Sequence, residues 1–200
     1  MEPHLAEPVS RKLRKARDRL SEMREGLTRV KELVLDLRTF SRLDEGEYKT
    51  VDIVEAIDTV LLLLKHKMNN RIQVEKHYGA ARLLHCSAGR INQVLMNLIA
   101  NAVDAMTAEG RIVITTSQTS EVFSISIRDT GAGIPESIRG KIFDPFFTTK
   151  PVGQGTGLGL AISYGIVQDH HGSIQVLSQE GRGTEFLVKI PLDLETQRAK

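Results

Sequence analysis

Two asparagines and an aspartate recur at helical spacing in the run NLIANAVDA, residues 97–105. On a helix, Asn97, Asn101 and Asp104 share one face, and the apolar residues between them turn away from it. A stripe of amides has little reason to serve solubility, because amphipathic helices ordinarily carry Lys and Glu there. Amide oxygens are neutral, hard ligands that suit a Mg²⁺ ion whose charge is already balanced by phosphates. Buried hydrogen bonding is the alternative for this stripe.

A carboxylate and two glycines follow a predicted strand in DTGAGIP, residues 129–135. A carboxylate at a strand end, here Asp129, can accept a hydrogen bond from an exocyclic amine such as that of adenine. Gly131 and Gly133 let the backbone approach a flat ligand closely. Taken alone, the cluster also fits an ordinary Gly-Pro turn.

A glycine-rich run, GQGTGLGL at residues 153–160, leads directly into a predicted apolar helix. Bare backbone amides at a helix N-terminus bind phosphate. The run is not a Rossmann fingerprint, and no P-loop is present because Gly140-Lys141 is followed by Ile142. The signatures of Ser/Thr/Tyr kinases are also missing. A flexible linker is the alternative, although the glycines run straight into the helix.

Three of the six phenylalanines lie within five residues of FDPFFTTK, residues 143–150. Such a stretch can be a lid whose aromatic side chains dock on the domain, with Lys150 near phosphate. A hydrophobic plug is the competing interpretation.

Composition excludes several classes of protein. A formal net charge of +2 over 200 residues gives no electrostatic case for nucleic-acid binding. The single cysteine, Cys86, excludes an internal disulfide and suits a reducing compartment. No signal peptide is visible, and no apolar run approaches the ~18 residues of a membrane span. We expect a cytoplasmic segment without membrane contact, whose parent protein could still be membrane-anchored.

The elements that position these residues mix strands and helices. Residues 9–43 predict one long helix, because apolar residues alternate three and four apart, as in a seam packed against another helix. The alternative is a helix folded back on its own domain. Hairpin-connected strands favour helices layered on a mixed sheet over a doubly wound fold. The expected helices are 51–67, 90–108, a short one near Ile138, and 158–170, and the expected strands are 72–77, 111–117, 122–129, 173–178 and 184–190.

Five short motifs follow one another in a specific order: N-x-x-x-N-A, D-x-G-x-G, F-x-P-F-F, G-T-G-L-G-L and G-x-G-T, the last at residues 181–184. Over residues 50–192, this order resembles the nucleotide-binding boxes of histidine kinases, within the ATPase superfamily shared with DNA gyrase and MutL. The run DLRTFSR at 36–42 resembles the second helix of the family's dimerisation and phosphotransfer hairpin.

The resemblance implies an α+β fold, a Bergerat-type α/β sandwich. In that fold about three helices cover a mixed sheet of about five strands, here after one long N-terminal helix. Residues 1–46 would be the second helix of the hairpin, and residues 47–200 the catalytic domain. ATP and Mg²⁺ would be the cofactors. The implied cofactor-binding residues are Asn97, Asn101, Asp104, Asp129, Gly131, Gly133, Ile134, Lys150, Gly155, Thr156, Gly157, Leu158, Gly159 and Thr184.

The resemblance also implies roles for these residues. Asn97, Asn101 and Lys150 would be catalytic: the two asparagines would serve Mg²⁺ and the phosphates, and Lys150 would reach the phosphates from the lid. Asp129 would hold the adenine amine, with Thr184 near the base. Gly155, Gly157 and Gly159 would form a hinge and phosphate cradle. Hydrolytic relatives carry a glutamate where Asn97 stands, and because an amide cannot act as a general base, phosphotransfer suits this sequence better than hydrolysis.

The implied activity is transfer of the γ-phosphoryl group of ATP to a histidine, with relay to an aspartate of a response regulator receiver domain. The full protein would be a homodimer through the hairpin. His4, the only histidine upstream of the hairpin helix, lacks the adjacent carboxylate and the proline spacing of the family's acceptor. We therefore expect the first hairpin helix and its acceptor to lie outside this sequence. The alternatives are a conformational ATPase of the gyrase/MutL type and a non-catalytic ATP-binding module.

Overall fold

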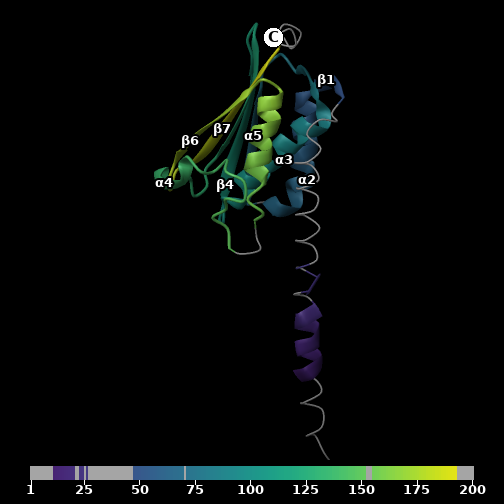
Figure 1. The fold of residues 1–200 in the computed structure, drawn as a ribbon, viewed down its shortest axis with the longest axis vertical. Coiled ribbons are helices and arrows are strands. Elements are labelled where there is room, and N and C mark those ends of the chain that lie inside the picture. Colours follow the sequence, from purple (N-terminus) through teal and green to yellow (C-terminus); the bar gives the residue numbers. More distant parts are fainter. Residues whose placement is uncertain are drawn as a thin grey trace, which may run out of the picture. The chain divides into compact units, whose positions relative to one another are not determined.

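The structure is a computed structural model, and it describes residues 11–20, 23, 24, 26, 47–69, 71–151 and 155–192. The chain divides into two compact units, one of residues 43–148 with 157–200 and one of residues 1–42 with 149–156. Each unit is described by itself. The larger unit holds every strand and helix labelled in Figure 1.

The strands of the larger unit form a mixed sheet and a separate small one. The five-stranded sheet has the order β2-β4-β5-β7-β6, in which β2 is parallel to β4 and every other pair is antiparallel. This confirms the prediction of a mixed sheet of about five strands. The bounds are Ile72–Tyr78 (β2), Gly110–Gln118 (β4), Val122–Asp129 (β5), Ser173–Gln179 (β6) and Gly183–Pro191 (β7).

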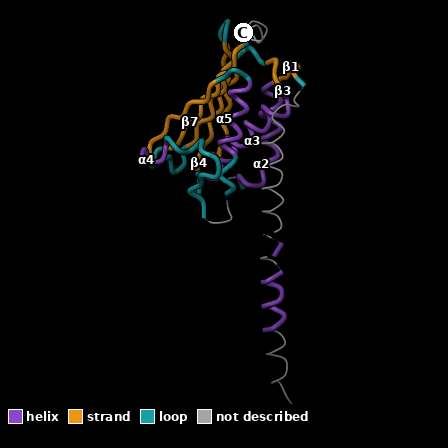
Figure 2. The backbone as a smooth tube through the Cα atoms, in the orientation of Figure 1, coloured by secondary structure: helices purple, strands orange, loops and turns teal. Residues whose placement is uncertain are grey.

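Three long helices cover one face of this sheet (Figures 1 and 2). They are α2 (Ile53–Met68), α3 (Ala88–Asp104) and α5 (Gly159–Asp169), while the short α4 spans Glu136–Arg139. The central helix α3 packs against α2, α5 and β5. The alternation within β5 explains this layer, because Phe123, Ile125 and Ile127 are buried toward the helices and the residues between them are not.

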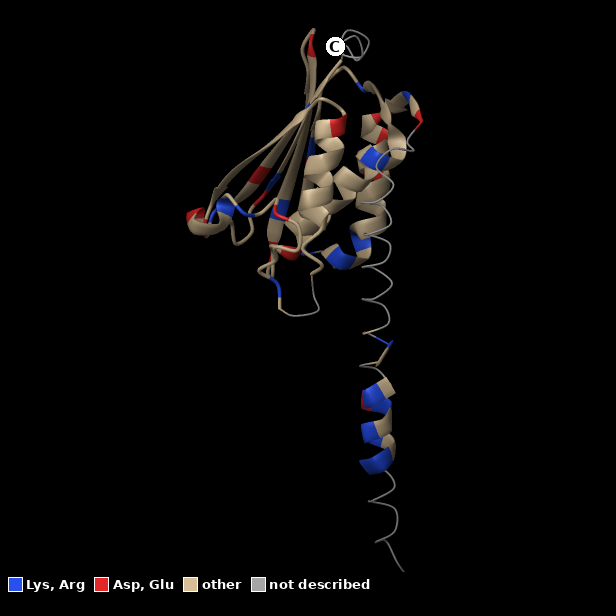
Figure 3. Cartoon of the chain, in the orientation of Figure 1, with Lys and Arg blue, Asp and Glu red and all other residues tan. Residues whose placement is uncertain are grey.

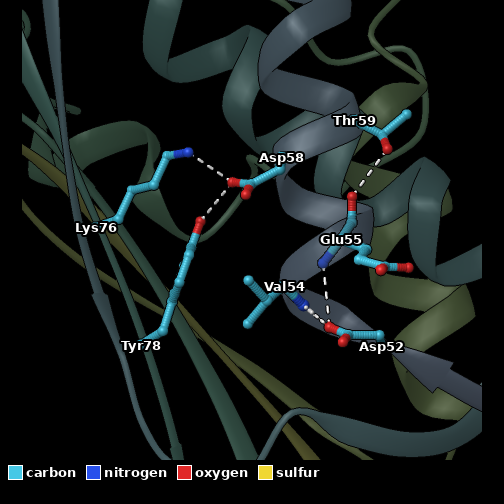
Figure 4. Close-up of polar contacts among 7 residues, drawn as sticks. All are labelled: Asp52, Val54, Glu55, Asp58, Thr59, Lys76 and Tyr78. Carbon is cyan, nitrogen blue, oxygen red and sulfur yellow. Dashed lines mark hydrogen bonds and ion pairs between the residues drawn. The ribbon is translucent and has the colours of Figure 1, made fainter.

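The sequence did not predict two of the strands. Tyr48–Asp52 (β1) and Leu83–Ser87 (β3) pair antiparallel in a separate two-stranded sheet. The residues expected to open a helix at 51 end β1 instead, and α2 begins after Asp52. The Asp52 carboxylate accepts the backbone N–H groups of Val54 and Glu55 at 2.9 and 3.1 Å, as Figure 4 shows. This cap ends the strand and starts the helix at one residue.

A polar cluster ties α2 to the edge strand β2 (Figure 4). Oδ1 of Asp58 accepts a hydrogen bond from Nζ of Lys76 at 2.6 Å and from the Tyr78 hydroxyl at 3.0 Å. The hydrogen bond from Lys76 lowers the pKa of Asp58, and burial together with the carboxylate raises the pKa of Tyr78. The cluster therefore fixes one end of the helix layer against the sheet.

The smaller unit contains the start of the predicted long helix. Residues 11–20 are helical and exposed, and Figure 3 colours most of this stretch blue because six of its ten residues are Lys or Arg. The seam residues Leu13, Leu20 and Met23 are more than 60% exposed, at 67%, 65% and 64%. Most of the remaining predicted helix, up to residue 43, lies outside the described residues. Among the helices that the structure describes, none is both long and apolar enough to cross a membrane.

Candidate functional site

Asp129 is a buried carboxylate at the end of β5. Asp129 is only 3% exposed. Its Oδ1 accepts hydrogen bonds from the backbone N–H groups of Gly131 at 2.8 Å and Thr184 at 3.3 Å. Burial raises the pKa of Asp129, and the two backbone hydrogen bonds partly offset that rise. No described residue donates a hydrogen bond to Oδ2. The carboxylate is therefore held through one oxygen and retains an acceptor for a ligand at the other.

The loop after Asp129 is pressed against the protein's own backbone. A Cβ at Gly131 would lie 2.6 Å from the carbonyl oxygen of Ala105, at the end of α3. Gly133 has φ +72°, and a Cβ there would lie 2.1 Å from the carbonyl oxygen of Gln179. The sequence predicts that these two glycines give room for a ligand. In the structure both are already required by close backbone contacts of the loop.

A serine in β6 joins this loop to β7. The Ser178 hydroxyl accepts the backbone N–H of Ile134 at 2.8 Å and lies 2.9 Å from the Thr184 hydroxyl and 3.0 Å from the carbonyl oxygen of Gly183. Thr184 is 5% exposed. Ile134, Ser178, Thr184 and Asp129 thus form one continuous network across three segments of the chain. This network holds the Asp129 carboxylate rigidly in place.

Asn97 is tied to the start of α5 through its side-chain nitrogen. Nδ2 donates to the carbonyl oxygen of Gly159 at 2.8 Å and to the Ser163 hydroxyl at 3.1 Å. No described residue donates to Oδ1 of Asn97. On the same helix α3, Asn101 is half-buried and Asp104 is exposed, so the predicted polar stripe runs from partly covered to open. Helix α3 joins the two parts of the site, because its last turn contacts the Asp129 loop through the hydrogen bond from Ala132 to Ala105 at 3.0 Å.

The predicted glycine-rich segment is only partly placed. Gly157 has φ +68°, and a Cβ there would lie 2.3 Å from the carbonyl carbon of Phe146, so the two backbones are in direct contact. Leu158 is buried, and Gly159 is the first residue of α5. Lys150, Gly155 and Thr156 belong to the smaller unit, so their positions relative to Asn97 and Asp129 stay predictions. Gly153 lies outside the described residues.

The phenylalanines of residues 143–147 differ in how far they are buried. Phe146 is 65% exposed and has φ +67°, an uncommon backbone conformation for a side chain of this size. Phe143 is half-buried and packs on Tyr164 of α5, with 5.3 Å between ring centroids. One aromatic of the predicted lid is therefore docked on the domain and another is exposed.

The arrangement can hold a polar, flat ligand at one end and anions at the other. Asp129 presents a buried acceptor, and the N-terminus of α5 presents backbone N–H groups beside the Asn97 amide. Among the described residues, no group of three or more His, Cys, Asp or Glu side chains is placed to hold a metal ion. A divalent cation here would therefore rely on amide oxygens and on anionic groups of the ligand.

Two residues of the site were missed in the sequence. Ser163 lies within an apolar helix and Ser178 within a strand, and neither belongs to a recognisable motif. Their links to the rest of the site include partners far away in the chain, 66 positions from Ser163 to Asn97 and 44 positions from Ser178 to Ile134. No local pattern could have identified them.

Comparison with known proteins identifies the family. Residues 86–194 match the model of the histidine kinase-, DNA gyrase B-, and HSP90-like ATPases. The chain is 35% identical to Sensor histidine kinase ZraS of Escherichia coli (strain K12) over 83% of its length, and 32% identical to Sensor kinase CckA of Brucella abortus (strain 2308) over 88%. It spans 36% and 20% of the lengths of these two relatives.

Solved structures agree. The catalytic domain of histidine kinase ThkA has 36% identity and a TM-score of 0.66, with 73% of this chain and 96% of that chain covered. A structure of ThkA in complex with the response regulator protein TrrA has 28% identity and a TM-score of 0.72, with 96% and 53% covered. The chain thus belongs to the family of histidine kinase-, DNA gyrase B-, and HSP90-like ATPases, and it carries the ATP-binding catalytic domain of a sensor histidine kinase.

Proposed function

We propose that this chain binds ATP with Mg²⁺ and transfers the γ-phosphoryl group to a histidine of a protein partner. The observation that carries the proposal is the state of the Asn97 amide. Its nitrogen is held by Gly159 and Ser163, and no described residue donates to its oxygen. An amide in this state is a neutral ligand, and it cannot activate water as a general base.

The resemblance to histidine kinases supports the following roles for the residues. Oδ2 of Asp129 accepts a hydrogen bond from the adenine amine, and Thr184 lies beside the base. Oδ1 of Asn97 and the Asn101 amide would hold the metal and the phosphates, and Asp104 continues the same stripe. Mg²⁺ supplies neutralisation of phosphate charge when bound. By the resemblance to histidine kinases, Lys150 and the backbone around residues 155–159 would orient the transferable group.

We further propose that the acceptor histidine lies outside these 200 residues. His170 is buried, with both ring nitrogens hydrogen-bonded to backbone groups. The four exposed histidines, at 66, 77, 85 and 171, lack the family's acceptor motif, and His4 lies outside the described residues. Residues 1–46 would contribute the second helix of a dimerisation hairpin, and residues 47–200 the catalytic domain.

The partner proposals rest on the relatives. ThkA was solved with the response regulator protein TrrA, and a receiver domain with a phosphorylatable aspartate would be the corresponding partner of this protein. The exposed seam residues Leu13, Leu20 and Met23 support a helical homodimer in the full protein. A cytoplasmic location would suit both the reduced Cys86 and such a partner.

The experiment uses the full chain and labelled ATP. Incubated alone with Mg²⁺, the chain should accumulate no acid-labile phosphate. Supplied with a separate helical hairpin that carries the first helix and its histidine, it should phosphorylate that histidine, and Asn97→Ala should abolish the transfer. Steady release of inorganic phosphate without any acceptor would instead favour a conformational ATPase, and nucleotide binding without transfer to any hairpin would favour a non-catalytic module.

A further inference from the structure

We infer that Ser163 is a positioning residue, which holds the Asn97 amide in the one orientation that presents its oxygen to the metal and phosphates of bound nucleotide. The inference rests on the proposed role of Asn97. It adds a residue from α5 to a function otherwise carried by α3 and the Asp129 loop.

The orientation of the Asn97 amide follows from the chemistry of its partners. The carbonyl oxygen of Gly159 can only accept hydrogen bonds, so the group 2.8 Å from it must be the Nδ2 donor. A flipped amide would place two acceptor oxygens in contact. The Gly159 carbonyl therefore decides which end of the amide faces α5, and Oδ1 lies on the other side of Cγ.

Ser163 adds the second constraint. One hydrogen bond would let the amide pivot about the line from Nδ2 to the Gly159 oxygen. The Ser163 hydroxyl also accepts a hydrogen bond from Nδ2, at 3.1 Å, and itself donates to the Gly159 oxygen at 2.8 Å. Three groups thus close a ring of hydrogen bonds, and two acceptors for one nitrogen fix the plane of the amide.

Burial makes this ring effective. Ser163 is fully buried, with 0% exposure, so water does not compete for its hydroxyl. Asn97 is half-buried, and because its nitrogen already makes two hydrogen bonds, its oxygen is the atom left for a ligand. Groups that orient a metal ligand from behind typically change metal affinity when removed by about 10–100-fold.

The test separates positioning from folding. We would compare Ser163→Ala, the isosteric Ser163→Cys and Ser87→Ala in the full chain. Ser87 is a suitable control because it is also buried, at 2% exposure, and precedes α3. No described residue bonds its hydroxyl. Affinities would be measured by calorimetry for ATP with excess Mg²⁺, for ATP with chelator, and for adenosine.

We expect Ser163→Ala to weaken Mg²⁺-dependent ATP binding by on the order of tenfold, while adenosine affinity changes less than about twofold, within the spread of neutral substitutions. Ser163→Cys should fall between it and the unaltered chain, because a thiol is a weak acceptor. Ser87→Ala should leave all three affinities unchanged. The variant Asn97→Ala, alone and combined with Ser163→Ala, completes a double-mutant cycle in which the Ser163 effect should disappear.

The outcomes distinguish the two levels of the argument. If Asn97→Ala leaves Mg²⁺-dependent binding intact, the proposed role of Asn97 is wrong. If Asn97→Ala weakens it but Ser163→Ala does not, only the positioning inference is overturned. Equal losses for Mg-ATP and adenosine, or additive effects in the double variant, would show that Ser163 is merely structural. If Ser163→Ala does not fold, Ser163→Cys carries the same comparison.

Discussion

The backbone N–H of Thr184 lies 3.3 Å from Oδ1 of Asp129, although the two residues are 55 positions apart in the chain. This contact closes the end of the β5–β7 pair around a buried carboxylate. It places an acidic side chain where its charge is poorly solvated, because Asp129 is only 3% exposed. The site is therefore arranged at some expense to the stability of the protein without nucleotide.

Asp129→Asn tests this relationship. An asparagine oxygen can still accept from Gly131 and Thr184, and the buried charge disappears. Since burial raises the pKa of Asp129, we expect the variant without nucleotide to have a higher free energy of unfolding at pH 7. ATP should bind more weakly, with a loss of about 1–3 kcal/mol for the mismatched polar group. Denaturant unfolding and calorimetry measure the two effects, and equal affinity of the unaltered chain for ATP and GTP would contradict the adenine contact.

Three glycines provide a graded test of backbone contacts. Gly183 has φ +96°, and a Cβ there would lie 2.0 Å from the Asp129 carbonyl oxygen, whereas Gly181 has φ +75° with open space around it. Gly165 lies within α5, also with open space. Gly181→Ala should lower the free energy of unfolding by about 1–2 kcal/mol and Gly183→Ala by ~3 kcal/mol or more. Gly165→Ala should raise it by roughly 0.5–1 kcal/mol. Chemical denaturation would rank the three variants by their free energy of unfolding. Any other order would contradict the backbone contacts assigned to these glycines.

A buried histidine should make stability depend on pH. The backbone N–H of Ser87 donates to Nε2 of His170 at 3.1 Å, so the ring proton lies on Nδ1, which donates to the Ile166 carbonyl oxygen at 2.7 Å. A second proton on Nε2 would face the Ser87 N–H. Burial lowers the pKa of His170 below its ordinary value of 6.5, Arg90 and His171 act in the same direction, and the Ile166 carbonyl and Asp169 act against it.

The sign follows from proton uptake. Below about pH 6.5 the unfolded chain binds a proton at this histidine that the folded chain does not, so the free energy of unfolding should fall as the pH drops through that range. Tyr48 of β1 also packs on the ring, 5.2 Å between centroids, but as an uncharged group it adds no opposing charge. His170→Gln should flatten the profile between pH 7.5 and 5.5, about one unit to either side of the ordinary value. His171→Gln, the exposed neighbour, should not. Parallel slopes in the two variants would assign the effect elsewhere.

Residues 136–156 are predicted to become ordered when ATP binds. Gly140, Gly153 and Gly155 lower the cost of rearranging the backbone. Phe143 and Phe147 already pack against the core, and docking of the exposed Phe146 would bury further apolar area in one of two discrete states. Hydrogen exchange of the full chain, with and without saturating Mg-ATP, should show increased protection across this segment. Identical protection at demonstrated saturation would remove the basis for a lid.

Lys150 provides a second check of the same segment. Lys150→Ala should weaken ATP binding more than adenosine binding, because its ammonium group is predicted to contact phosphate. Lys141→Ala, an exposed lysine of the same stretch, is the matched control. Calorimetric titrations with both ligands decide the matter, and a similar loss for ATP and adenosine would contradict the phosphate contact.

The sequence predicted secondary structure best where the residues that stabilise an element lie close together along the chain. The bounds of β5 match the predicted strand 122–129, because its inward and outward residues alternate without interruption. In contrast, β1 and β3 are only five residues each and stabilise each other across more than thirty residues. The run from Val51 also fits a helical pattern. Asp52, followed three residues later by Glu55, is a local signal for a helix start, and the prediction of a helix from Val51 overlooked it.

The same limit applies to the site. The spacing of Asn97 and Asn101 indicated a shared helix face, and α3 provides it. The carbonyl oxygen of Gly159 and the hydroxyl of Ser163 come within hydrogen-bond distance of Asn97 only because α5 lies against α3. Gly131 and Gly133 show a further limit, because the sequence alone does not reveal that each glycine also admits the protein's own backbone; their place beside a ligand stays a prediction.

The buried thiol of Cys86 in β3 can report local opening of this domain. Cys86 is 0% exposed, and burial raises the pKa of its thiol to about 11, so at neutral pH the folded chain presents almost no thiolate to an alkylating reagent. It is also the only cysteine in the sequence. The rate of alkylation of Cys86 therefore reports how often β3 separates from the core. A ligand that binds only the closed domain lowers this rate in proportion to the fraction of the protein that it occupies.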